Sequence, residues 1–441
     1  MKKFFFLFRA IIFLLFFVSC STESTSVNES SSTSEPVKEW GSIEYGSLGE
    51  PKISAHLEGM GYIELNGKEY VIIPFADQFG TIYDYLRFFE LDRQNMLLTD
   101  RTLELFDEPV KIGFPKQLFI EDFNNNGQKD FFLVDHGKEE VMIDGRFEGW
   151  YLQIYYASEN GFNKQNFPGI TDKRLFYHHA DIADYNNNGY VDIISQRWAS
   201  ATEEVPGGST ISLLENNYGE FSLIDLENPP TGAGSVAFVD MGEGNKMNAL
   251  AIDYLEEGGI VWYWDIENDR TEIINESDLE PTEIHDIIKI PNGRTKRLIF
   301  LGEQYAHLDR SVSPIQYSDD YGSTIQPLDV NQLYQGRDVF KDDFNFNGVQ
   351  DVYLYAIHDQ YGSGAWADNF GNLIDAFWIN SGDGSLRSPH SITDKFGNIY
   401  DNEKSVDFIP LKAGTEGYEF INIEDYFGVP HRFKLHELII E

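Results

Sequence analysis

A nine-residue pattern, D-x-N-x-N-G-x-x-D, recurs three times in this chain of 441 residues. Its copies occupy residues 122–130, 184–192 and 343–351, and each copy lies between two apolar runs of strand type. Internal repetition constrains the fold strongly, because each repeat must be one structural unit that buries its apolar face against its neighbours. The chain is therefore expected to be an array of similar β-units.

Four further segments keep parts of the same pattern. Segment 61–73 keeps an Asn-Gly turn and the second apolar run, 239–252 keeps only the first Asp, and 287–300 and 406–421 keep the strand-turn-strand outline. The turns then fall at positions 67, 127, 189, 245, 293, 348 and 417. Seven units with a period of about 58 residues would account for the whole chain from residue 38 to residue 441.

A second pair of apolar runs follows the first in each unit, as at 150–156 and 160–162. Apolar runs bounded by Asn, Asp and Gly predict strands and hairpins, so each unit should contain about four strands. Four-stranded sheets repeated radially are the blades of a β-propeller. We therefore predict an all-β fold for residues 38–441, a seven-bladed β-propeller of four-stranded blades. A row of β-sandwiches is the alternative, but each sandwich would need about 100 residues.

The three full loops resemble those of FG-GAP or VCBS repeats, the blades of the integrin alpha-chain propeller and of many bacterial exported proteins. Three loops match the family pattern well and the other four units match it in outline. The spacing nevertheless covers the chain from residue 38 onward. The resemblance is specific for the fold and weak for the function.

Calcium is the cofactor that this resemblance implies. Calcium takes about six to eight oxygen ligands, and a short loop can supply them from positions 1, 3, 5 and 9 and from the carbonyl of position 7, with glycine at position 6. The resemblance assigns about three ions to the side chains of Asp122, Asn124, Asn126, Asp130, Asp184, Asn186, Asn188, Asp192, Asp343, Asn345, Asn347 and Asp351, and to the carbonyls of Gln128, Tyr190 and Val349.

Two other interpretations of these loops exist. An EF-hand does not fit, because no Glu stands at position 12 and no helices are expected around the loops. Asn-Asn-Gly is also ordinary hairpin turn chemistry, although three loops in the same register with an Asp at position 9 favour calcium. With only two carboxylates in each loop, we expect modest affinity and a structural role for the ion.

The N-terminus has the layout of an export signal. Residues 1–19 combine a basic start, a short apolar stretch and a small residue, which is typical of a signal peptide. Phe17-Val18-Ser19-Cys20 resembles the lipobox of bacterial lipoproteins, which implies lipidation of Cys20. An ordinary cleaved signal and an uncleaved anchor helix are the alternatives. Residues 20–37 are rich in Ser and Thr and predict a flexible tether.

These features predict an exported protein that is lipid-anchored to a bacterial membrane, at the outer membrane or cell surface. The formal net charge of -40 leaves no electrostatic footprint for nucleic acid. One cysteine excludes an internal disulfide framework and a thiolate zinc cluster. We expect a monomer that meets the membrane through its lipid anchor only.

A ligand site is predicted where the blades meet the channel, on the rim opposite the calcium loops. Positions six residues before the loops, together with neighbouring aromatic residues, are the candidates for binding a small anion such as a uronate, sulfate or carboxylate. They are His56, Lys116, His178, His179, Trp198, Arg337 and Trp366. The alternative is that these side chains satisfy turns and fill the core between blades.

These inferences favour a surface-anchored binding or adhesion module for glycan or protein ligands. A carbohydrate-active enzyme resembling a polysaccharide lyase is the alternative, with Lys116, His178 and Arg337 at the channel mouth. No GxSxG, HExxH, Walker loop or complete GxGxxG motif is present in the sequence. No catalytic residue is assigned.

Overall fold

A computed structural model describes the chain over residues 40–53, 55, 58–76, 83–138, 142–143, 146–201, 209–224, 227–240, 246–253, 259–276, 283–292, 295–303, 315–327, 336–356, 377–382, 385–399, 408–423 and 429–441. By its contacts the chain divides into two units, Met1–Lys38 and Glu39–Glu441, and every described residue belongs to the second. The predicted signal peptide, Cys20 and the tether lie outside the described residues. In the described part, no helix is long and apolar enough to cross a membrane.

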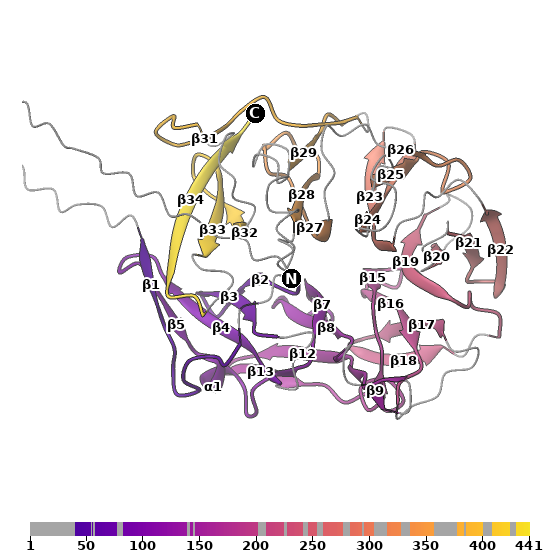
Figure 1. Ribbon diagram of the computed structural model, residues 1–441, viewed down its shortest axis with the longest axis horizontal. Helices are drawn as coiled ribbons and strands as arrows, with labels where there is room; N and C mark the ends of the chain where they lie inside the picture. The colour runs from indigo at the N-terminus through magenta and orange to yellow at the C-terminus, as the bar shows by residue number, and fades with distance from the viewer. Residues whose placement is uncertain are drawn as a thin grey trace, which may run out of the picture. The chain divides into compact units, whose positions relative to one another are not determined.

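Five four-stranded antiparallel sheets follow one another along the chain (Figure 1). In each sheet two strands joined by a short loop are followed by a second pair. The first two sheets contain β7 (Pro115–Glu121), β8 (Asp130–Asp135), β12 (Gln153–Ser158) and β13 (Gly161–Lys164), then β15 (Ala180–Ala183), β16 (Asp192–Trp198), β17 (Ser209–Asn217) and β18 (Glu220–Ile224). The third contains β19 (Ala233–Val239), β20 (Asn248–Asp253), β21 (Val261–Asp265) and β22 (Arg270–Asn275).

The fourth and fifth sheets have the same order. They contain β23 (Glu283–Asn292), β24 (Thr295–Glu303), β25 (Ile315–Ser318) and β26 (Gln326–Pro327), then β27 (Gly336–Asp342), β28 (Asp351–Ala356), β29 (Phe377–Asn380) and β30 (Leu386–Arg387). Two short pairs, β9 (Met142–Ile143) with β10 (Arg146–Phe147) and β11 (Trp150–Tyr151) with β14 (Arg174–Leu175), and the helix α1 (Thr102–Leu105) lie in the connections.

The two ends of the described chain share one larger sheet of ten strands, with the order β2-β3-β4-β5-β1-β34-β33-β32 and with β6 on β4 and β31 on β34. Its strands are β1 (Gly41–Glu44), β2 (Gly61–Leu65), β3 (Lys68–Pro74), β4 (Asp84–Asp92), β5 (Leu97–Asp100), β6 (Lys111–Ile112), β31 (Ile392–Asp394), β32 (Phe408–Ala413), β33 (Tyr418–Ile423) and β34 (Arg432–Ile440). Strand β1 joins the two ends, because it pairs antiparallel with β34 and parallel with β5.

The core lies between neighbouring sheets, because consecutive strand residues point to opposite faces. Phe131 of β8 packs in one apolar cluster with residues of β2 to β4, whereas the next residue, Phe132, packs in another cluster with residues of β16 and β17. In the same way, Ile193 of β16 packs with residues of the first sheet, whereas Ile194 packs with residues of the third.

The chain of clusters returns to its start. One cluster combines residues of the ten-stranded sheet, such as Val71 of β3, Phe89 of β4 and Phe420 of β33, with Tyr353 of β28 in the fifth sheet. Each of the five sheets therefore packs against the next, and the ten-stranded sheet packs against the first and the fifth, which is how propeller blades are held together. The predicted all-β class and propeller arrangement are confirmed. A row of sandwiches is not observed, since its sheets would pack in separate pairs.

Candidate metal loops and central cavity

The three full-pattern loops connect the first two strands of their sheets: β7 to β8, β15 to β16, and β27 to β28. Two of them lie side by side on one rim, because Asn125 Nδ2 donates a hydrogen bond to the Gly189 carbonyl at 2.7 Å. On the other side, Gln128 Nε2 donates to Asn66 Oδ1 at 3.2 Å. Asn66 begins the Asn-Gly turn between β2 and β3, so the degenerate copy of the pattern occupies the same rim.

The loops fold alike, and the side chains at positions 1, 3 and 5 organise them. In the first loop, Asp122 accepts the amide of Asn126 at 3.0 Å and that of Gly127 at 2.7 Å. Asn124 Oδ1 also accepts the Asn126 amide, and Asn126 Oδ1 accepts that of Gln128. The equivalent bonds in the other two loops are all between 2.8 and 3.1 Å.

The backbone of these loops requires left-handed conformations at two positions. Position 4 has φ of 56°, 56° and 59° in the three loops, and the glycine at position 6 has φ of 86°, 87° and 82°. No atom lies within 4 Å of a Cβ built on any of the three glycines. Glycine is therefore needed for the backbone conformation and not for space.

The aspartate at position 9 is the first residue of the second strand, and it is fully buried in all three cases. Asp130 accepts the amide of Phe123 at 3.0 Å and that of Ala157, on the third strand of its sheet, at 2.7 Å. Asp192 and Asp351 make the same pair of bonds, to position 2 or 3 of the loop and to the third strand. This carboxylate therefore ties the loop to the sheet.

The carboxylates at positions 1 and 9 repel each other. Burial raises the pKa of Asp130 to about 6, that of Asp192 to about 7 and that of Asp351 to about 6. In each loop the position-1 aspartate adds to the rise. A cation placed between the two carboxylates would reverse the repulsion and stabilise both charges.

The donor set of each loop fits a hard cation of calcium's size. Each loop concentrates two carboxylates and two amide oxygens within nine residues, and oxygen is the donor that calcium takes. Within the described ranges, no three or more His, Cys, Asp or Glu side chains are grouped to hold a metal. Such a group is not expected here, because amide and carbonyl oxygens would complete the shell.

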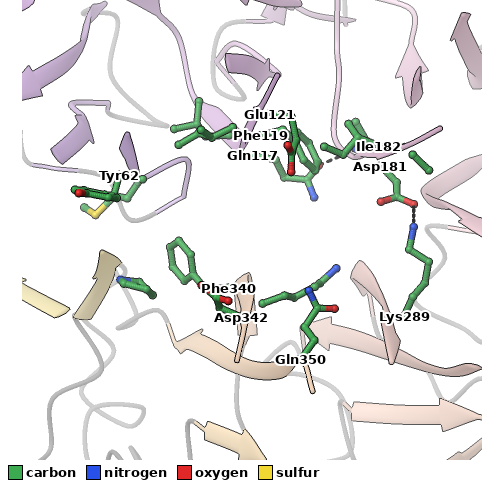
Figure 2. Close-up of a pocket in the computed structure, with 18 of the residues that line it drawn as sticks. Tyr62, Gln117, Phe119, Glu121, Asp181, Ile182, Lys289, Phe340, Asp342 and Gln350 are labelled. Atoms are coloured by element: carbon green, nitrogen blue, oxygen red, sulfur yellow. Dashed lines mark hydrogen bonds and ion pairs between the residues drawn. The ribbon is translucent and has the colours of Figure 1, made fainter. Parts of the chain in front are cut away.

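A central cavity of about 650 Å³ opens among the first strands of the sheets (Figure 2). The first strands of seven units contribute to its lining, β2, β7, β15, β19, β23, β27 and β32, and Tyr418 of β33 adds to it. Consecutive residues of the innermost strands line it, as residues 117–121 of β7 and 180–183 of β15 do. Glu121 and Asp342 immediately precede two of the full-pattern loops, so the cavity reaches the rim that carries these loops.

Charged groups in this cavity are largely carboxylates. Its lining includes the acids Glu121, Asp181, Asp240 and Asp342 and the bases Lys289 and Lys341. Asp181 faces Lys289 in Figure 2, at 2.5 Å, and also accepts the Phe238 amide at 2.8 Å. Asp342 accepts the Tyr418 hydroxyl at 2.6 Å. The excess of acids makes the cavity a poor receptor for a small anion.

Two of the predicted ligand-binding residues are buried and engaged elsewhere. Lys116 is 6% exposed, pairs with Glu58 at 3.2 Å and lies over the ring of Phe114. His178 is 4% exposed, and its amide donates to Gln196 Oε1. Neither is among the residues that line the central cavity. A register shift between Pro115 and Gln117 interrupts the alternation of β7 at Lys116, which accounts for its direction.

The remaining predicted residues divide into buried and undescribed ones. His179 is 1% exposed and accepts the Val236 amide on Nδ1 at 3.3 Å. Trp198 stacks on Phe176 with ring centroids 5.5 Å apart and donates from Nε1 to the Ala233 carbonyl, so it serves the contact between sheets. His56, Trp366 and the side chain of Arg337 lie outside the described residues.

The cavity residues Asp181, Lys289 and Asp342 were missed by sequence reasoning. The signal that could have found them is membership of the first strand of each unit, since that strand lies innermost in a propeller blade. The residues six positions before the loops share only their distance along the chain, and that distance does not determine how their side chains pack.

The comparisons with known proteins give no family. No protein-family model matches the chain, and no curated protein matches it. A chain in the cryo-EM structure of RAG in complex with one melted RSS and one unmelted RSS matches with 8% identity, a TM-score of 0.31, and coverage of 77% of this chain and 97% of that one. The structure of the Dos1 propeller gives 8% identity, a TM-score of 0.36, and coverage of 67% and 65%.

Proposed function

We propose that residues 38–441 form a seven-bladed β-propeller that binds about three calcium ions and acts as an exported, lipid-anchored binding module for glycan or protein ligands. Support for seven blades comes from the cavity lining, to which seven strands that each begin a unit contribute: β2, β7, β15, β19, β23, β27 and β32. The ten-stranded sheet then contains two blades, β2 to β5 and β32 to β34, with β1 as the outer strand of the second.

The calcium proposal is carried by the recurrence of one hydrogen-bonded loop geometry at three places. Asp122, Asn124, Asn126 and Asp130, with the Gln128 carbonyl, would hold the first ion. The corresponding sets would be Asp184, Asn186, Asn188, Asp192 and Tyr190, then Asp343, Asn345, Asn347, Asp351 and Val349. Bound calcium supplies positive charge between paired carboxylates, and the protein residues order the rim around the cavity.

The central cavity is the binding site that this proposal favours. Its volume lies in the range of small-ligand pockets. Its walls combine aromatic and apolar side chains, such as Phe119 and Tyr62, with the polar Gln117 and Gln350. Such a lining fits a neutral glycan or a protein segment with a basic side chain better than a uronate or sulfate, because carboxylates outnumber ammonium groups there.

The polysaccharide-lyase alternative receives no comparable support from the described residues. Lys116 pairs with Glu58, is buried and does not line the cavity, so its side-chain nitrogen is not positioned to act as a base on a substrate there. The Arg337 side chain is not among the described ones. The binding module is therefore the function that we carry forward.

Thermal unfolding of the chain from Cys20 onward, in calcium and in chelator, tests the metal part of the proposal. Calcium should raise the midpoint, because a ligand that binds only the native state stabilises it. Asp122→Ala should reduce this rise, whereas Asp394→Ala is the matched control, since Asp394 also accepts backbone amides in a turn but belongs to no metal loop. An unchanged midpoint in calcium would contradict the proposal.

Ligand binding is tested separately, in calcium, with a panel of neutral and acidic glycans and basic peptides. A binder should protect the native state and should lose affinity when Asp342→Asn and Asp181→Asn alter the cavity. Tyr218→Ala, at an exposed residue that does not line the cavity, is the control variant. Binding that all three variants retain would place the ligand site elsewhere.

A further inference from the structure

A short hairpin carries exposed apolar side chains at residues 393–399. Phe396 is 80% exposed and Ile399 is 62% exposed, among the largest exposures of apolar residues in the described chain. Lys395 lies beside them, with its Nζ 5.6 Å from the centre of the Phe396 ring. An exposed aromatic residue next to a lysine is typical of surfaces that meet a membrane interface.

The hairpin holds these side chains in a defined conformation. Asp394 Oδ1 accepts the amides of Phe396 and Asn398 at 2.9 and 2.8 Å, and Asn398 Nδ2 donates to Asp394 Oδ2. Thr393 and Ile399 form an antiparallel bridge, and Gly397 has φ of 80°. The local bonds fix the turn, so presentation of Phe396 at its tip costs little further conformational entropy.

This hairpin and the first described strand lie along the same edge of β34. Strand β31, which leads into the hairpin, pairs Asp394 with Leu438, and β1 pairs Gly41 with Phe433 (Figure 1). The chain before β1 and the chain after β31 therefore run toward each other along this edge. At about 3.4 Å per residue, the five steps along β34 from Phe433 to Leu438 correspond to about 17 Å.

The position of Trp40 marks where the tether reaches the folded unit. Trp40 is partly buried, and Lys434 Nζ lies 5.7 Å from the centre of its ring. Nineteen residues separate Cys20 from Trp40, so as a flexible chain this segment has a root-mean-square reach of about 25 Å. A lipid anchor at Cys20 would hold the β34 edge close to the membrane surface.

We propose that the hairpin 393–399 is a membrane-contact element that inserts Phe396 and Ile399 into the lipid interface. This inference rests on the proposed lipid anchor and adds a second contact to it. Two side chains bind lipid weakly by themselves, but the tether converts their binding into an intramolecular event at high effective concentration. The contact orients the propeller, because a flexible tether alone would leave its orientation unrestricted.

The test uses the single cysteine of the chain. The protein from Cys20 onward is coupled through that thiol to maleimide lipid in phosphatidylcholine vesicles, which keeps the natural tether and does not depend on lipidation by a cell. Brominated acyl chains then report whether an introduced indole reaches the bilayer. The variants are Phe396→Trp and, as a matched control, Tyr218→Trp, since Tyr218 is 82% exposed at the tip of a different hairpin.

Subtraction of the parent protein removes the signal of the seven native tryptophans. We expect bromine quenching and a blue shift for Phe396→Trp on vesicles, and neither for Tyr218→Trp. Equal quenching of both, or of neither, would overturn the proposal. A blue shift of Phe396→Trp that grows with protein concentration without vesicles would also overturn it, because a second copy would then cover the hairpin.

The proposed lipid anchor at Cys20 is tested by a different measurement. Mass analysis of the protein isolated from membranes reports whether Cys20 carries lipid, and the coupled protein gives its result in either case. Loss of lipidation with retained quenching would refute the anchor alone. Lipidation without quenching would refute the hairpin contact alone.

Discussion

The loop at 122–130 and the hairpin at 393–399 begin with the same local chemistry and end with different roles. Asp122 and Asp394 each accept the amide four residues later, at 3.0 and 2.8 Å. Each turn also contains a glycine at positive φ, Gly127 at 86° and Gly397 at 80°. The loop also contains what the hairpin lacks, because Asp130 brings a second, buried carboxylate to it from the following strand.

This difference teaches that an aspartate turn alone does not indicate a metal loop. A turn satisfies its aspartate with backbone amides and needs no ion. A second carboxylate in the buried interior creates a concentration of negative charge that a cation can stabilise. The predictions below test whether that second carboxylate is what separates the two regions.

The largest effect should follow from Asp192→Ala. Asp192 occupies position 9 of the second loop, as Asp130 does in the first. The change removes the acceptor for the amides of Tyr185 and Asn216 in a fully buried site. Loss of a buried acceptor costs about 1–3 kcal/mol for each unsatisfied group, so the free energy of unfolding should fall by about 3–4 kcal/mol. Urea denaturation in chelator measures it. A loss no larger than that of Asp394→Ala would erase the distinction between loop and hairpin.

The next largest effect is on the pH dependence of the free energy of unfolding, through His436 of β34. Burial lowers the pKa of His436 to about 4, with Lys434 adding to the fall and Asp394 opposing it. The unfolded state therefore takes up a proton near pH 6.5 while the folded state does not, so stability falls as the pH drops from about 6.5 to about 4. One pKa unit corresponds to about 1.4 kcal/mol, so we expect a loss of about 2–3 kcal/mol.

His436→Gln isolates this contribution, because glutamine is polar and does not titrate. Unfolding free energies of the two proteins, measured at several pH values between 4 and 7, should converge toward low pH. The ring centroids of His436 and Phe408 lie 4.9 Å apart, so the substitution also removes a packing contact and lowers stability at neutral pH. Parallel curves for the two proteins would contradict the assigned pKa.

A smaller effect is expected in the response to calcium. With dissociation constants of 10⁻⁴ to 10⁻³ M, 10 mM calcium stabilises by about 1.4–2.7 kcal/mol for each site. Asp122→Ala should remove one such contribution, whereas Asp394→Ala should retain all of them. The measurement is the difference between unfolding free energies in calcium and in chelator. A calcium response that both variants retain would show that the loop is only a turn.

The smallest effect sharpens the comparison at the level of the backbone. Gly127→Ala and Gly397→Ala both place a side chain at positive φ where no atom lies within 4 Å of the new Cβ. Each should cost about 1 kcal/mol in chelator, which is the strain of a left-handed residue. Equal losses in urea denaturation would show that the two turns share their geometry, and a clear inequality would show that they do not.

The repeat pattern allowed the sequence to predict the loops and the strands around them. Positions 1, 3, 5 and 6 of each loop act on atoms within a few residues, so their roles follow from local order along the chain. The Asn66–Gly67 turn between β2 and β3 was predicted for the same reason. Alternation of apolar residues likewise predicted the strands and the propeller arrangement.

The ligand residues could not be predicted in the same way. Whether Lys116 faces the axis or Glu58 depends on a register shift in β7 and on the neighbouring chain, not on its distance from a loop. Lys289 and Asp181 are 108 residues apart and meet only because β15 and β23 both face the axis. The hairpin at 393–399 was not recognised either, because its exposure depends on which edge β31 joins.

By itself, the sequence determined the all-β class, the period of the units and the oxygen-rich loops, because these rest on bonds and side-chain alternation within short segments. Tertiary structure alone decided the charge of the central cavity, the burial of His178 and the place of the apolar hairpin beside β1. The physical reason is that strand pairing and packing between sheets bring together residues that are far apart in the chain, and burial and charge are properties of that assembly.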